Sequence, residues 1–346
     1  MRQYNVAIVG YGWVSGAHIA AINASKQARV TAVYSSRPLD AAELSRRHGS
    51  PLTCFDDLGR MLARDDIHVV SICSYPHQHA EQLIATVNAG KHFIIEKPIT
   101  LTLDEARAVA KAVNAAGVKG CVCFEGRFSG QFLATKSLID QGFLGTIHYA
   151  EVDYYHGIGP WYGQYRWNTL KSSGGSSLLS AGCHALSSML LCMGNEVESI
   201  TTVTTRSQSV HFSNYEYPTT SVSILRFSGG RLGKVASVID CLQPYYRHIH
   251  LVGSEGSLLD DKFHSQRIKG LDSHRWSVLG TNKLDSGNVH DHPYLTQFEA
   301  FFSALTRNED MPLTSFNEGM LTHRLALAAD LSAEIGKPLT FDDVAV

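Results

Sequence analysis

The sequence predicts an α/β Rossmann domain with a parallel sheet at residues 1–124, followed by an α+β domain with a large, mostly antiparallel open sheet at residues 125–346. Three observations support this. Strand-like and helix-like segments alternate through the first part, and a glycine-rich turn follows the first of these strands. After about residue 125, successive strand-like segments are separated by turns. A chain of 346 residues is also long enough for two domains.

In the first domain, short segments rich in β-branched residues alternate with helical ones. Strands are expected at 4–9, 29–34, 68–73, 92–96 and 118–124, with a weak one near Leu52, and helices at about 16–25, 38–48, 77–89 and 102–116. Thr102 and Glu105 form a capping box, and Gly117 ends the helix that it begins. Such βαβ units place a ligand crevice beyond the carboxyl ends of the strands.

The second domain is expected to form its sheet from consecutive strands. These are predicted at 146–155, 198–206, 219–227, 231–240 and 246–252, with Gly, Ser and Pro turns between them and two late helices near 293–306 and 316–335.

Composition narrows the class of protein. The net charge of −2 and the pI of about 6.8 give no basic footprint for a nucleic acid. No apolar run reaches the roughly 18 residues that span a bilayer, and the N-terminus begins a strand rather than a signal peptide. The seven cysteines form no CxxC pair, so free thiols are expected. These features favour a cytoplasmic protein without nucleic-acid or membrane partners.

Histidine is abundant, with 17 residues and three His-x-His pairs at 77/79, 248/250 and 290/292. Residues i and i+2 of a strand share a face, which is compatible with metal binding. No carboxylate or cysteine stands at a spacing that completes a site, so no metal is expected.

The segment GYGWVSGAH at residues 10–18 predicts dinucleotide binding. Gly10 allows the tight turn out of the strand, and Gly12 lets the backbone approach a pyrophosphate at the start of the next helix. Ser15 replaces the third glycine of the usual pattern, with Gly16 beside it. The residues expected to contact the cofactor are Gly10, Gly12, Trp13, Val14, Ser35, Ser36, Arg37, Ser74, Tyr75, His79, Glu96 and Lys97.

The end of the second strand bears on the choice between NAD and NADP. An NAD site has an acidic residue there for the ribose hydroxyls, whereas this chain has Tyr34-Ser35-Ser36-Arg37. Because arginine pairs with a 2′-phosphate, NADP is slightly favoured. If Arg37 instead points to solvent or stacks on adenine, NAD remains usable.

Residues 94–98 read IIEKP at the end of a strand, at the rim where nicotinamide is expected. Together with GYGWVSGAH, AGKHFIIEKPITLTLDEA, FEGRFSGQFLATKSLIDQGFLGTIHYAEV and SGGSSLLSAGCHAL, this segment makes nearly the whole chain resemble the Gfo/Idh/MocA oxidoreductases. The resemblance implies NAD(P)-dependent oxidation of a secondary alcohol in a sugar, inositol or glycoside, or its reverse. It also implies a homo-dimer or homo-tetramer.

The same resemblance implies roles for two residues. Lys97 matches the catalytic lysine, whose ammonium hydrogen-bonds the reacting oxygen, and His184 matches the general base. The family's aspartate four residues before this histidine is Ser180 here, and the acid three residues after it is Ser187. Both departures put the rate, the pH range and even the kind of chemistry in question.

The aromatic segment DYYHGIGPWYGQYRW at residues 153–167 is expected to line the substrate pocket, since aromatic rings stack on the C–H faces of sugars. Several of these rings have packing of the loop, or of a subunit interface, as their alternative role. Arg166 and Lys171 are candidates for an anionic group, and His292 and Tyr294 for the pocket border. The predicted substrate residues are Glu125, Arg127, Tyr155, His156, Trp161, Tyr162, Trp167, Ser180 and His184.

Two further functions stay open. One is a redox-neutral glycosidase or epimerase, in which tightly bound NAD oxidises a ring carbon to a transient keto-sugar and later returns the hydride. The other is a non-catalytic nucleotide or sugar sensor, against which the presence of both Lys97 and His184 counts.

Overall fold

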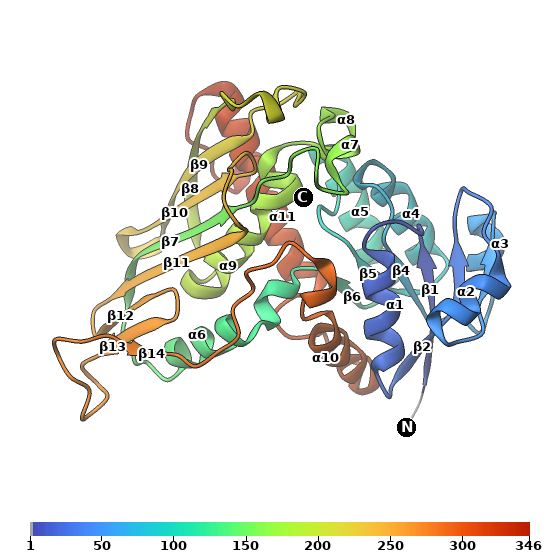
Figure 1. Cartoon of the computed structure of the whole chain (residues 1–346), viewed down its shortest axis with the longest axis horizontal. Helices are drawn as coiled ribbons and strands as arrows, with labels where there is room; N and C mark the ends of the chain where they lie inside the picture. The colour runs from blue at the N-terminus through green and yellow to red at the C-terminus, as the bar shows by residue number, and fades with distance from the viewer. Residues whose placement is uncertain (1–2) are drawn as a thin grey trace. The chain divides into compact units, whose positions relative to one another are not determined.

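The computed structural model describes residues 3–346, which divide into two compact units (Figure 1). Among the described residues, the first unit holds those up to Glu125 together with Pro293–Met320, and the second holds Gly126–His292 and Leu321–Ala345. The segment Pro293–Met320, which the sequence places after residue 124 in the second domain, thus belongs to the first unit. Aromatic packing explains this, because Phe302 stacks on Tyr4 at 6.0 Å and Phe298 meets His18 edge-on at 5.0 Å.

The first unit contains a parallel sheet in the order β3-β2-β1-β4-β5-β6, which confirms the predicted Rossmann architecture. Its strands are β1 (Tyr4–Val9), β2 (Ala28–Tyr34), β3 (Thr53–Phe55), β4 (Val69–Ile72), β5 (His92–Ile95) and β6 (Gly120–Val122). Its helices are α1 (Ser15–Ala24), α2 (Ala41–His48), α3 (Leu58–Leu62), α4 (Pro76–Asn88), α5 (Leu103–Ala116) and α10 (Tyr294–Arg307). The predicted capping box at Thr102 and Glu105 forms, and Gly117 ends α5 with φ +63°.

The second unit is built on an eight-stranded sheet in the order β14-β13-β12-β11-β7-β10-β9-β8. Every pairing is antiparallel except β7 with β10, in agreement with the predicted mostly antiparallel sheet. Its strands are β7 (Ile147–Tyr155), β8 (Val197–Thr205), β9 (Thr220–Phe227), β10 (Arg231–Val238), β11 (Tyr246–Gly253), β12 (Gly256–Leu259), β13 (Lys262–Ser265) and β14 (Ser277–Val278). The last three are absent from the sequence prediction because they are only two to four residues long and carry little apolar alternation.

In the second unit, helix α9 packs against β7 and β10 of this sheet, and α6 packs against α9 (Figure 1). The helices are α6 (Gly130–Asp140), α7 (Tyr165–Asn168), α8 (Lys171–Gly174), α9 (Cys183–Met193) and the greater part of α11 (Phe316–Ile335). The stretch Lys171–Met193 is long and apolar enough to cross a membrane by composition alone, but 94% of its most apolar window is buried, as in the core helix of a soluble protein.

Candidate functional site

The turn after β1 is shaped for a dinucleotide. Gly10 has φ +87°, and a Cβ there would lie 2.8 Å from the backbone N and Cα of Ser74. At Gly12 a Cβ would meet nothing within 4 Å, so the space in front of this turn stays open. Ser15 Oγ donates to the Gly12 carbonyl at 2.8 Å, and α1 begins without a side-chain cap. The backbone N–H groups at the start of α1 and the open space at Gly12 are therefore suited to binding a pyrophosphate.

Arg37 reaches from the end of β2 to this turn. Its Nη2 donates to the carbonyl of Tyr11 at 2.9 Å, and its backbone N–H donates to Ser35 Oγ. Ser35 is buried, while Ser36 and Arg37 are exposed. The guanidinium therefore lies beside the glycine turn, at the end of the second strand, where a Rossmann fold has its ribose-binding residue.

The loops after β4 and β5 are tied together by His79. Its Nδ1 lies 2.7 Å from the Pro98 carbonyl and its Nε2 lies 3.2 Å from the Ser74 carbonyl. Burial lowers the pKa of His79, and a neutral ring donates to one of these two carbonyls at a time. This residue, predicted to touch the cofactor, lies between the loops that carry Ser74 and Lys97. Tyr75 in the same loop is half exposed, as is Trp13 after Gly12.

Glu96, predicted as a cofactor contact, directs its carboxylate into the first unit. Its Oε1 lies 3.1 Å from His18 Nε2 and accepts from the Tyr294 hydroxyl at 2.9 Å. Its Oε2 accepts from the backbone N–H of Lys97 at 3.2 Å. Burial opposes ionisation of His18, yet Cys73 and Glu96 raise its pKa to about 10. Glu96 therefore holds the backbone of Lys97 in place through this hydrogen bond.

In the second unit, His184 lies in the first turn of α9, directly after a π-helical turn at Leu178–Gly182. The side chain is 5% exposed and stacks on Tyr154 of β7, with ring centroids 5.9 Å apart and planes 17° from parallel. A π-turn at this point widens the helix and is typical of functional sites.

Tyr154 connects His184 to an aromatic cluster that we define as Tyr154, His156, Tyr162, Tyr245 and Arg247. The Tyr154 hydroxyl lies 3.1 Å from His156 Nδ1, and Tyr245 contacts both rings edge-on. Tyr162 packs against His156 at 4.6 Å. Arg247 Nε donates to the Tyr245 hydroxyl at 2.7 Å, with its guanidinium over both tyrosine rings. Of the predicted substrate residues, His156, Tyr162 and His184 are thus brought together.

Arg127 and the two serines replacing acids have defined places. Arg127 is buried and donates to Ser187, from Nε to Oγ at 2.7 Å and from Nη2 to the carbonyl at 2.6 Å. It therefore anchors the start of the second unit to α9 at Ser187, the position at which the family resemblance expects a carboxylate. Ser180 is buried in the π-turn, where its hydroxyl interacts with Tyr217.

Other predicted residues lie elsewhere. Tyr155 points to the opposite face of the sheet from Tyr154, where its hydroxyl donates to Asp153 and its ring stacks on Tyr246. Trp161 is 58% exposed and contacts His211 and Phe212. Trp167 lies in the short helix α7, and Glu125 is buried at the end of the first unit.

Sequence reasoning missed Tyr154, Tyr245 and Arg247. The strand pattern itself indicates that Tyr154 faces the core. Ala150 and Val152 are apolar residues on the same face of β7, and both are buried. Tyr245 and Arg247 carry no such local signal, since their place beside Tyr154 follows from the pairing of β11 with β7.

The turn before His184 is supported from α11. Ser176 Oγ donates to Asp330 Oδ2 at 2.6 Å and accepts from the backbone N–H of Leu179. Burial raises the pKa of Asp330 to about 7 from an ordinary value of 3.8.

A folded-state pKa above the unfolded value means that the folded protein retains a proton between about pH 4 and 7. Stability is therefore lost as pH rises through this window and is constant above it. We expect Asp330→Asn to keep the bond to Ser176 and to raise the unfolding free energy by about 1–3 kcal/mol at pH 8. Near pH 4 the gain should vanish. Urea unfolding at both pH values measures this, and an equal effect at the two would contradict it.

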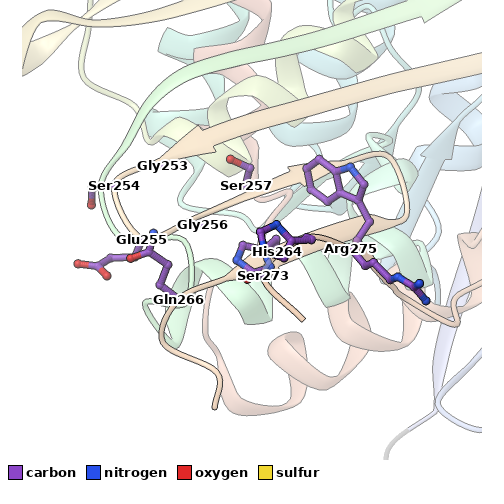
Figure 2. A pocket seen from close by; sticks show the side chains of 11 residues that line it. Gly253, Ser254, Glu255, Gly256, Ser257, His264, Gln266, Ser273 and Arg275 are labelled. Atoms are coloured by element: carbon purple, nitrogen blue, oxygen red, sulfur yellow. The ribbon is translucent and has the colours of Figure 1, made fainter. Parts of the chain in front are cut away.

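A separate cavity of about 380 Å³ lies at the β12–β13 hairpin (Figure 2). Its polar lining includes Glu255, His264 and Arg275, together with Trp276. None of the sequence-predicted site residues lines this cavity, and it is distinct from the aromatic cluster beside His184.

Comparison with known proteins relates both units to one family. Residues 4–124 match the profile described as "Oxidoreductase family, NAD-binding Rossmann fold", and residues 132–259 match the GFO/IDH/MocA C-terminal domain. An inositol 2-dehydrogenase of Rhizobium meliloti is 24% identical over 93% of this chain and 94% of its own length. A myo-inositol 2-dehydrogenase of Thermotoga maritima is 22% identical over 98% of this chain and 99% of its own length.

Solved structures share the complete fold. A levoglucosan dehydrogenase in complex with NADH and levoglucosan superposes with a TM-score of 0.85 at 22% identity, covering 98% of this chain and all of that one. At this identity the likeness concerns the fold.

Proposed function

Because the chain belongs to the GFO/IDH/MocA family of NAD-binding oxidoreductases, we propose that it transfers hydride between a nicotinamide cofactor and a secondary hydroxyl of a sugar, inositol or glycoside. The observation that carries this proposal is the buried His184, stacked on Tyr154 within an aromatic cluster. Such rings suit the C–H faces of a carbohydrate, and the imidazole is a base for its hydroxyl. The names of the inositol and levoglucosan dehydrogenases support the substrate class.

We propose that Lys97 and His184 divide the handling of the proton. The nicotinamide, when bound, supplies the hydride acceptor or donor. His184 takes the hydroxyl proton, and Tyr154 holds its ring in plane by stacking. The Lys97 ammonium hydrogen-bonds the reacting oxygen and stabilises its developing negative charge. Glu96, fixed by His18 and Tyr294, holds the Lys97 backbone in position.

Absorbance of reduced nicotinamide tests the proposal directly. The purified chain with NAD⁺ or NADP⁺ is expected to produce it with at least one member of a panel of inositols, aldoses and glycosides. A chain that binds nucleotide but shows no turnover across the panel would contradict net oxidation.

One observation favours a second candidate, the redox-neutral glycosidase or epimerase. Ser180 and Ser187 stand where the family resemblance expects carboxylates, and Ser187 is engaged by Arg127. An imidazolium at His184 therefore lacks those two stabilising charges. A nucleotide that survives purification, together with cleavage or epimerisation of a glycoside without net reduction, would favour this candidate.

We propose NADP as the preferred cofactor, on the position of Arg37 beside the glycine turn. Arg37→Ala is expected to lower kcat/KM for NADP⁺ by about tenfold or more and to leave that for NAD⁺ within about twofold, because a charge-assisted phosphate contact is lost. Steady-state kinetics with both nucleotides measure this, with Arg46→Ala on the neighbouring α2 as control. Equal losses for the two nucleotides would show that Arg37 serves the turn rather than a 2′-phosphate.

The same family membership supports a homo-dimer or homo-tetramer as part of this proposal, and the absence of a CxxC pair and of a signal-like N-terminal pattern supports a cytoplasmic location. Sedimentation velocity of the purified chain measures its assembly state.

A further inference from the structure

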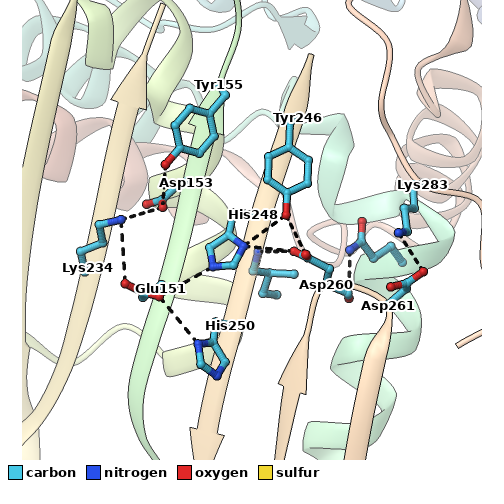
Figure 3. A network of polar contacts seen from close by, with 12 residues as sticks. Glu151, Asp153, Tyr155, Lys234, Tyr246, His248, His250, Asp260, Asp261 and Lys283 are labelled. Atoms are coloured by element: carbon cyan, nitrogen blue, oxygen red, sulfur yellow. Dashed lines mark hydrogen bonds and ion pairs between the residues drawn. The ribbon is translucent and has the colours of Figure 1, made fainter. Parts of the chain in front are cut away.

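Three side chains of metal-ligating type converge on one face of the second unit's sheet (Figure 3). His248 and His250 lie two residues apart on β11 and therefore on the same face of the sheet. Glu151 lies on the adjacent strand β7, directly opposite His250 in the register. Strand pairing thus brings a carboxylate next to this His-x-His pair, although no carboxylate stands at a suitable spacing from the pair in the sequence. The three side chains are between 20% and 32% exposed.

The distances leave room for an ion. Glu151 Oε2 lies 3.7 Å from His248 Nε2 and 3.7 Å from His250 Nδ1, too far for direct hydrogen bonds. A tetrahedral zinc ion with bonds of 2.0–2.1 Å holds its ligand atoms about 3.3 Å apart. The three ligand atoms all lie within 4.8 Å of one another, so side-chain rotation can bring them around one ion.

The orientation of His248 matches that of a metal ligand. Its Nδ1 lies 3.2 Å from Asp260 Oδ1, which leaves Nε2 directed at Glu151. Asp260 is itself held by the backbone N–H of Ile249 at 3.1 Å and by the Tyr246 hydroxyl at 2.6 Å. A fixed carboxylate behind a histidine is the outer-shell arrangement that orients metal-binding imidazoles.

The local charge also favours a cation. Three carboxylates, those of Glu151, Asp153 and Asp260, lie around the two histidines, and the ammonium of Lys234 pairs with the first two of them. Lys234 Nζ bonds Asp153 at 2.7 Å and approaches only Oε1 of Glu151, at 3.9 Å. The Oε2 atom faces both histidines, and Tyr149 also hydrogen-bonds this carboxylate.

We propose that Glu151, His248 and His250 bind a divalent transition-metal ion of the zinc class, with solvent completing the coordination. Two imidazoles and one carboxylate are ligands that Zn²⁺, Co²⁺ and Ni²⁺ share. The site lies on the other face of the sheet from Tyr154 and His184, so its ion is separate from the hydride chemistry and the inference does not rest on the proposed function.

Zinc binding by the tag-free, chelator-treated full chain tests the proposal. Titration against a chromophoric chelator is expected to show one equivalent of Zn²⁺ that the His250→Gln variant lacks. Glu151→Gln should weaken binding by at least about tenfold, and Asp260→Asn, which only positions His248, by about 10–100-fold. Co²⁺ should give the visible absorption of a four-coordinate ion, and Zn²⁺ should raise the Tm of the wild-type chain but not of His250→Gln.

His148→Gln is the matched control. This exposed histidine lies on the same strand as Glu151, but its side chain is on the opposite face of the sheet. It should bind Zn²⁺ as the wild type does. If the wild type binds no more Zn²⁺ than His250→Gln and Glu151→Gln, with all three equally folded by circular dichroism, the cluster is an ion-pair network and the proposal is wrong.

Discussion

Replacing Lys97 by methionine is expected to lower kcat/KM for the carbohydrate substrate by about 10²–10⁴-fold. The methionine keeps the length of the side chain and removes the ammonium that stabilises charge on the reacting oxygen. Nucleotide affinity, measured by fluorescence, should change by less than about threefold, because the glycine turn and Arg37 are untouched. His184→Gln should give a loss of similar size, as expected for two groups acting on one proton.

Lys111→Met, on the exposed face of α5, is the matched control and should keep wild-type kinetics. If Lys97→Met raised KM alone and left kcat intact, Lys97 would be a binding residue. The proposed division of proton handling would then be incorrect.

Substitution of the two glycines of the β1 turn is expected to separate binding from folding. Gly12→Ala should lower nucleotide affinity by about tenfold or more, because its methyl group fills the open space that a pyrophosphate needs. Its thermal stability should match that of the wild type, since nothing lies within 4 Å of the new Cβ. Binding is measured by fluorescence titration and stability by Tm.

Gly10→Ala should act on the fold instead. A residue with φ +87° and a Cβ 2.8 Å from the backbone of Ser74 forces the β1 and β4 turns apart, at a cost of about 2–4 kcal/mol. A stable Gly10→Ala chain would contradict this steric argument, and a Gly12→Ala chain with normal affinity would contradict the assignment of this turn to a dinucleotide.

Several features could be predicted from the sequence because their causes are local. The order of strands and helices in residues 4–124 follows from apolar periodicity, and the start and end of α5 follow from Thr102, Glu105 and Gly117. The glycine turn follows from sterics, since few residues other than glycine adopt the backbone of Gly10. The positions of Lys97 and His184 came from motifs rather than from any contact, and their roles remain predictions.

Only the tertiary structure decided which side chains meet, because such contacts depend on strand register and on packing between distant segments. The register of β7 with β11 brings Tyr245 and Arg247 to Tyr154 on one face, and Glu151 to His248 and His250 on the other. Successive side chains of a strand point to opposite faces, which explains why Tyr155 lies away from the aromatic cluster although its neighbour Tyr154 belongs to it. The burial of aromatic surface placed Pro293–Met320 in the first unit, although it follows the second sheet in the sequence. Local chemistry thus determined the elements and the motifs of this protein, whereas long-range register and burial determined the composition of its sites.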